Sequence, residues 1–146
     1  MSEVRFLEEA RIYIYAMDFT IMIDKMVNHG SWRKKDALKT EKLYKNFLFL
    51  NKKYGDSYSL PPSEDIDEFW HNHILDTERY HHDCQTIFGK YFHHYPYFGI
   101  DEHSTMDDLD NAFEKTQELH FKEFGEYIYS TRSANSKFLN FFLLKK

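Results

Sequence analysis

Helical spacing of apolar residues runs through almost the whole chain, and few residues interrupt it. Only 5 glycines and 3 prolines occur among 146 residues, and the strict apolar–polar alternation of half-buried strands is nearly absent. The clearest example lies in residues 35–54, where apolar side chains recur at helical intervals at Leu43, Phe47, Leu50 and Tyr54. The pattern predicts an all-α fold, in which one compact domain contains about five to six helices.

Stop and cap signals divide the first half of this pattern. Residues 3–29 are apolar around much of the helix circumference, which predicts either one bent helix or two, ended by Gly30. Pro61 and Pro62 prevent a helix from continuing through them. Ser63 follows as a good N-cap, so we expect the next helix to begin there and to run through Leu75.

In the second half, Asp76 starts a second cap signal, and we expect a turn there before a helix that ends at Phe88. Residues 90–100 are rich in aromatic side chains and are predicted to form a loop or a short turn. Ser104 is predicted to cap a long final helix. We assign residues 1–130 to the helical domain and residues 131–146 to a polar linker with an apolar tail.

Composition narrows the class of protein. The hydrophobic fraction of 42% and the charged fraction of 29% are typical of globular chains. A net charge of -5 argues against nucleic acid as a partner, because such binders carry a basic face. Cys84 is the single cysteine, which fits a reducing compartment. No signal peptide or membrane-span pattern is seen, so we expect a cytoplasmic protein, with export by a non-classical route left open.

Six of the nine histidines lie between His71 and His94. Asp67 and His71 are four residues apart and share one face of the predicted helix. His73 lies roughly 200° around the same helix from His71, so both cannot face one small ion. The pair His93-His94 precedes a rigid proline and is placed to fold back over the helix. We therefore predict a small polar pocket, formed by the two histidine-rich helices and the loop of aromatic residues that follows them, that holds a metal site built from Asp67, His71 and His94, with His73 and His93 in reserve.

Two nitrogen donors, one oxygen donor and an open position are the pattern of catalytic zinc or non-haem iron. Such an ion would permit metal-assisted hydrolysis or oxygen chemistry, and the sequence selects neither reaction. Trp70, Tyr80 and Asp83 are the expected supporting residues. The structural alternative is that His71 is a buried imidazole bonded to Asp67, which would organise helix packing.

One run of the sequence resembles the glycine-rich domain-containing-protein-like family, which includes plant multidomain proteins and short bacterial proteins. The matching residues are Asp67-x-Phe69-Trp-His-x-His-Ile-Leu-Asp-Thr77, Tyr80, Asp83-Cys84, Phe88-Gly89 and His93-His94-x-Pro96-Tyr-Phe-Gly99. The resemblance implies an isolated helical domain without the accessory segments of the larger relatives. The plant relatives are linked with stress responses and RNA association, for which their accessory segments could account.

The C-terminal segment motivates a different class of function. The run Phe138–Leu144 is apolar, lies beyond a polar stretch and falls outside the resemblance. In this alternative the protein is a non-enzymatic interaction domain that binds a protein partner through its tail, and the histidine and tryptophan motif is structural.

Overall fold

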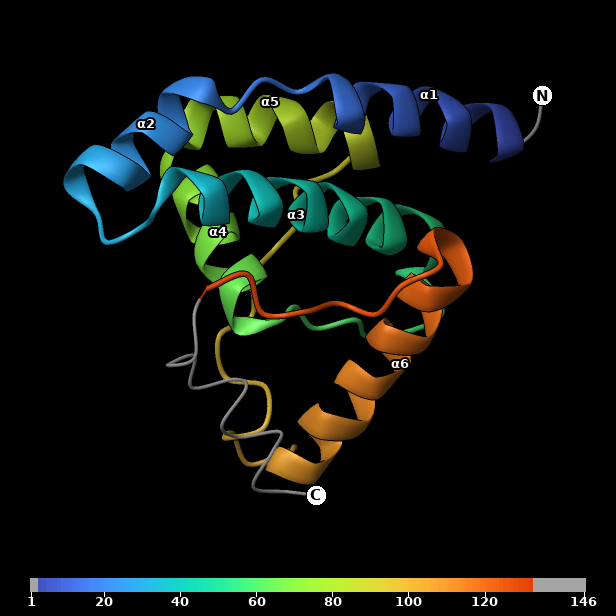
Figure 1. Cartoon of the computed structure of the whole chain (residues 1–146). Helices are drawn as coiled ribbons and strands as arrows, with labels where there is room; N and C mark the ends of the chain where they lie inside the picture. Colours follow the sequence, from blue (N-terminus) through green and yellow to red (C-terminus); the bar gives the residue numbers. More distant parts are fainter. Residues whose placement is uncertain (1–2, 133–146) are drawn as a thin grey trace.

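Six helices make up the part of the chain that the structure, a computed structural model, describes, which is residues 3–132 (Figure 1). They are α1 (Glu3–Ala16), α2 (Thr20–His29), α3 (Lys34–Tyr54), α4 (Glu64–Leu75), α5 (Thr77–Phe88) and α6 (Met106–Phe124). No strand occurs within the described residues, so the all-α prediction is confirmed. None of these helices is long and apolar enough to cross a membrane.

Helix ends follow the local sequence at most positions. Residues 3–29 form two helices instead of one bent helix. The Ser63 hydroxyl accepts a hydrogen bond from the Ile66 N–H at 3.3 Å, so Ser63 caps α4 as predicted. Asp76 separates α4 from α5, which confirms the predicted turn, although its side chain makes no capping bond to α5.

The prediction that Ser104 caps the last helix was wrong. Thr105 is the N-cap of α6 and forms a capping box with Asp108. The Ser104 hydroxyl instead accepts a hydrogen bond from the Gly99 N–H at 2.8 Å and donates one to Asp101. Ser104 therefore closes the preceding loop, and the helix begins one residue later than predicted.

The helices pack in two parts. α1 and α2 lie along α3, with α5 beside α1 and with α4 between α3 and α5, whereas α6 extends away from the end of α3 (Figure 1). The core between the packed helices is rich in aromatic rings. Phe19 contacts Phe69 edge-on at 5.4 Å between ring centroids, and Phe47 contacts Trp70 at 5.2 Å. A smaller cluster of Leu50, Leu60 and Leu119 joins α6 to the end of α3.

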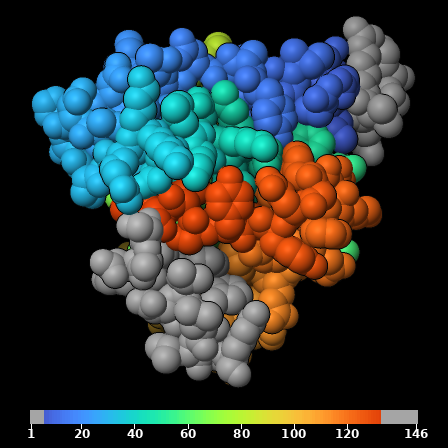
Figure 2. Space-filling model, viewed as in Figure 1, coloured from blue at the N-terminus to red at the C-terminus, as the bar shows by residue number. Residues whose placement is uncertain are grey.

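After α6 the chain returns across α3 to the start of α4 as an extended segment, residues 126–132, which we call the strap (Figure 1). In the space-filling view it forms a continuous band beneath α3 (Figure 2). Gln117 holds its beginning, because its side chain donates to the Ile128 carbonyl at 2.9 Å and accepts from the Ile128 N–H at 2.6 Å. The strap is therefore part of the packed domain.

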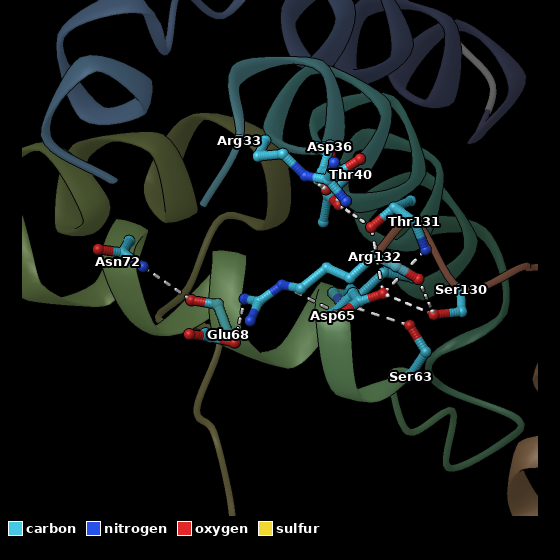
Figure 3. A network of polar contacts seen from close by, with 11 residues as sticks. Arg33, Asp36, Thr40, Ser63, Asp65, Glu68, Asn72, Ser130, Thr131 and Arg132 are labelled. Atoms are coloured by element: carbon cyan, nitrogen blue, oxygen red, sulfur yellow. Dashed lines mark hydrogen bonds and ion pairs between the residues drawn. The ribbon is translucent and has the colours of Figure 1, made fainter. Parts of the chain in front are cut away.

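The far end of the strap is bound to the buried carboxylate of Asp65 on α4 (Figure 3). Asp65 accepts hydrogen bonds from the Thr131 N–H at 2.9 Å and from the Thr131 hydroxyl at 3.1 Å. Arg132 Nε lies 3.5 Å from Asp65 Oδ1, and the same guanidinium forms an ion pair with Glu68. Its Cζ atom lies 3.4 Å from the centroid of the Trp32 ring, a cation–π contact. Thr131 and Arg132, placed by the sequence in a linker, thus contact the domain. The predicted tail lies outside the described residues.

Replacement of Phe69 by alanine should lower the free energy of unfolding by about 3–5 kcal/mol, because the ring is fully buried and its removal leaves a cavity. The change is measured by urea unfolding at equilibrium. Ile21→Ala, at a side chain that is 86% exposed, should change stability by no more than about 0.5 kcal/mol. Equal losses in the two variants would contradict this description of the core.

Replacement of Asp65 by alanine should lower the free energy of unfolding by about 3 kcal/mol, because Arg132 and the Thr131 N–H would lose their buried partner. Asp56→Ala, at an exposed residue after α3, is the matched control and should be nearly neutral. If urea unfolding gives the same stability for both variants, the strap is not held through Asp65.

Candidate metal centre

The site begins with two side chains on one outward face of α4. The helical spacing places Asp67 and His71 one turn apart, and their Oδ2 and Nε2 atoms are 3.5 Å apart. The His71 side chain is 53% exposed and that of Asp67 is 33% exposed. His71 is therefore not the buried imidazole of the structural alternative, although it does contact Asp67.

The third side chain comes from the loop after α5, residues 90–100, which we call the aromatic loop. His94 packs against Trp70, with 4.4 Å between the ring centroids. Phe92 also stacks on the Trp70 indole, with 4.8 Å between the ring centroids. Tyr80 supports this arrangement from α5, because its hydroxyl accepts a hydrogen bond from the Trp70 indole N–H at 2.9 Å and donates to the Phe92 carbonyl. Trp70 and Tyr80 therefore position the loop that carries His94.

These three side chains converge on one point. His94 Nε2 lies 2.5 Å from Asp67 Oδ1 and 3.1 Å from His71 Nε2. Within the described residues the three ligand atoms form a group with all separations below 4.8 Å. Donors of a tetrahedral ion at about 2.0–2.1 Å are themselves about 3.3 Å apart. The separations from His94 Nε2 to Asp67 Oδ1 and to His71 Nε2, 2.5 and 3.1 Å, are both shorter than this value, so the donors would have to move apart by a few tenths of an ångström or more to hold one ion.

The donor chemistry also fits a cation. A neutral imidazole carries a single N–H, and one hydrogen on His94 Nε2 cannot point at both the Asp67 carboxylate and His71 Nε2. With the hydrogen of each imidazole on Nδ1, both Nε2 atoms and the Asp67 carboxylate direct lone pairs at the same point. A divalent cation bonded to all three atoms would use these lone pairs together.

His73 is not part of this group. It is fully buried on the other side of α4, where its Nε2–H donates to Asp83 Oδ2 at 2.8 Å and its Nδ1 accepts from the Tyr44 hydroxyl at 2.7 Å. Both ring nitrogens are used, so no lone pair is left for an ion. Tyr13 also donates to the Asp83 carboxylate at 2.6 Å. Asp83, expected to support the site, instead supports this internal network.

The electrostatics of this network follow from burial. Desolvation is the largest effect at His73 and lowers its pKa below the usual value, despite the hydrogen bond to Asp83. At Asp83 desolvation opposes ionisation, but the hydrogen bonds from His73 and Tyr13 outweigh it and lower the pKa. Burial also raises the pKa of the Cys84 thiol next to Asp83, so this cysteine is not activated as a thiolate.

His93 takes a different position from its neighbour. It is exposed, its ring lies 4.7 Å from that of Tyr91, and it lines a cavity of about 680 Å³ that also reaches Asp67 and His94. The sequence predicted a small His- and Asp-lined pocket at this place, but it gave neither the apolar character of most of the lining nor the part of the wall that comes from α6. The sequence feature that could have indicated the rest of the cavity is the extended run Leu60-Pro61-Pro62. This run forms another wall, and the Pro61 carbonyl accepts a hydrogen bond from the Thr116 hydroxyl on α6.

Comparison with protein families gives a match over most of the chain. A family model described as UCP032817-like matches residues 8–119, which is 112 of the 146 residues. The search of curated proteins and the search of solved structures each gave no match. The resemblance to the glycine-rich domain-containing-protein-like family was wrong, because the matching model is a different one and spans most of the domain instead of a motif of about 35 residues.

The two buried histidines predict how stability depends on pH. Desolvation lowers the pKa of His73 and of His120 below 6.5, while the unfolded chain protonates both near 6.5. As pH falls through 6.5, the unfolded state gains protons that the folded state does not bind, so the free energy of unfolding must decrease. Urea unfolding at pH 7.5 and 5.5 should show this decrease.

A pair of variants tests the cause. His120 donates to the Glu126 carbonyl and faces Asn46, and His120→Gln should make the decrease between pH 7.5 and 5.5 smaller. His82→Gln, at an exposed position on α5, should retain the full decrease. A full decrease in the His120 variant would show that this imidazole contributes nothing to the acid sensitivity.

Proposed function

This chain belongs to the UCP032817-like family, and we propose that it binds a divalent transition-metal ion, Zn²⁺ or Fe²⁺, between α4 and the aromatic loop. The observation that supports the proposal best is the convergence of Asp67, His71 and His94 from two separate segments, with ligand atoms within 4.8 Å of one another. Two imidazoles and one carboxylate are borderline ligands that suit these ions better than Mg²⁺ or Ca²⁺.

Three protein ligands leave at least one coordination position for water or another molecule. That position is consistent with a catalytic ion, which would act as a Lewis acid or would lower the pKa of a bound water. The cavity beside Asp67 and His94 gives a second molecule room to approach. Metal binding is thus the proposed function, and metal-assisted hydrolysis and oxygen chemistry are the two reaction types that the donor set supports.

Tag-free protein should bind one Zn²⁺ or Fe²⁺ per chain, as measured by elemental analysis after dialysis and by calorimetric titration of the metal-free protein. His71→Ala and His94→Ala should each weaken binding by more than about 100-fold, which is the upper limit for losing a residue that only supports a ligand. His71 is the more informative position, because it is exposed and its removal leaves the core intact.

His93→Ala and His82→Ala are the matched controls, since both residues are exposed histidines in the same part of the chain. Each should retain the affinity of the unaltered protein. Absence of stoichiometric metal binding by the unaltered protein, or equal weakening in all four variants, would overturn the proposal. Far-ultraviolet circular dichroism and urea unfolding of each variant would separate loss of a ligand from loss of the fold.

A further inference from the structure

The cavity beside the three side chains has the size and the walls of a small-molecule site. Its volume of about 680 Å³ lies within the range of about 300–1,000 Å³ that is usual for ligand pockets. Its walls come from the end of α3, the segment before α4, α4 itself, the aromatic loop and the first half of α6. Most of the lining is apolar, and its apolar residues include Leu60, Trp70, Phe92, Phe98, Leu109 and Phe113.

The walls are held in place by specific contacts. Pro61 accepts a hydrogen bond from the Thr116 hydroxyl at 3.0 Å, which fixes the segment before α4 against α6. Gly99 has a φ of +94°, and a Cβ added there would lie 3.2 Å from Leu109, so the aromatic loop approaches α6 closely at this residue. The cavity is therefore bounded by segments with defined positions and does not depend on one mobile loop.

The charges of the lining limit the ligand. Glu64, Asp67 and Asp110 line the cavity, and no lysine or arginine is among the residues of 3–132 that do so. Apart from His93 and His94, an anionic ligand would thus find no basic side chain from this part of the chain, and it would lie near the carboxylates of Glu64 and Asp110. Burying an unpaired anion is costly, whereas burying an uncharged apolar molecule is favourable.

Only one end of the cavity offers strong polar binding. Asp67 and His94 belong to the lining and are also two of the three proposed metal ligands, so an ion bound there would lie at the cavity wall. A molecule in the cavity would direct one lone pair toward this ion, and the rest of it would contact apolar side chains. This arrangement favours a ligand with one donor atom over a polyanion or a sugar.

We propose that this cavity binds an uncharged, largely apolar small molecule that has one nitrogen or oxygen donor directed at the metal ion. The contact to the ion rests on the proposed metal-binding function, whereas the shape and charge of the cavity do not. The two parts are therefore tested separately, first without metal and then with it.

The test without metal uses two fluorescent probes that differ by one sulfonate. With chelator present, the protein should increase the fluorescence of uncharged N-phenyl-1-naphthylamine and bind it at least about tenfold more tightly than 1-anilinonaphthalene-8-sulfonate. Ser59→Trp should abolish binding of the uncharged probe, because Ser59 is exposed and lines the cavity. Ser57→Trp, at an exposed serine two residues away and outside the lining, should have no effect.

The test with metal uses the Co²⁺-loaded protein, whose visible absorption reports new ligands. 4-Phenylimidazole should alter the spectrum at a concentration about tenfold or more below that needed for imidazole, because its phenyl ring enters the cavity. This advantage should disappear in Ser59→Trp and persist in Ser57→Trp.

The outcomes distinguish the two proposals. No binding of N-phenyl-1-naphthylamine, or equal binding of its sulfonated analogue, would overturn the cavity inference even if metal binds. Binding of the uncharged probe without any Co²⁺ spectrum would contradict the metal site and the donor contact. Equal potency of 4-phenylimidazole and imidazole on the Co²⁺ protein would refute the placement of the ligand against the ion.

Discussion

The imidazole of His73 joins the helices of the core through its two ring nitrogens. It accepts a hydrogen bond from Tyr44 on α3 and donates one to Asp83 on α5, and Asp83 accepts a further bond from Tyr13 on α1. The imidazole is fully buried, so each polar group in this chain of bonds would lose its partner if one helix turned or slid. Four helices are thereby held in one relative arrangement, and the rotation of α4 about its own axis is fixed.

That rotation determines what α4 presents on its outer face. With His73 directed inward, the 100° step per residue carries His71 and Asp67 to the outside. Trp70 lies between these two faces, and there it contacts both the core and the ring of His94. One helix therefore carries two histidines of different kinds. His73 is internal and inert because both of its ring nitrogens are hydrogen-bonded, whereas the Nε2 atom of the external His71 faces His94 and Asp67. Identical side chains two residues apart differ in chemistry because of where the helix places them.

Local sequence was enough to predict the features that arise within one helix. The Ser63 cap and the pairing of Asp67 with His71 follow from spacing along a single element. Proximity of the aromatic loop to α4 was predicted, and His94 was preferred to His93. No local signal carries that preference, since stacking on an indole from another helix decides which of the two turns inward. The bond between Asp65 and Thr131 spans 66 residues and left no local signal. The apolar part of the predicted pocket and its wall from α6 left no local signal for the same reason, because segments far apart in the sequence form them.

The proposed metal site depends on the fold more than the fold depends on it. The core already buries a large cluster of apolar side chains, and the Tyr80 bond and the stacked Trp70 ring hold the aromatic loop against α4 without an ion. Small zinc domains differ in this respect, because their folding free energy comes from the metal itself. Here an ion would find its three donors already positioned, so little of its binding free energy would be spent on ordering the chain. Such preorganisation is what an ion needs if it is to keep an open coordination position beside a cavity.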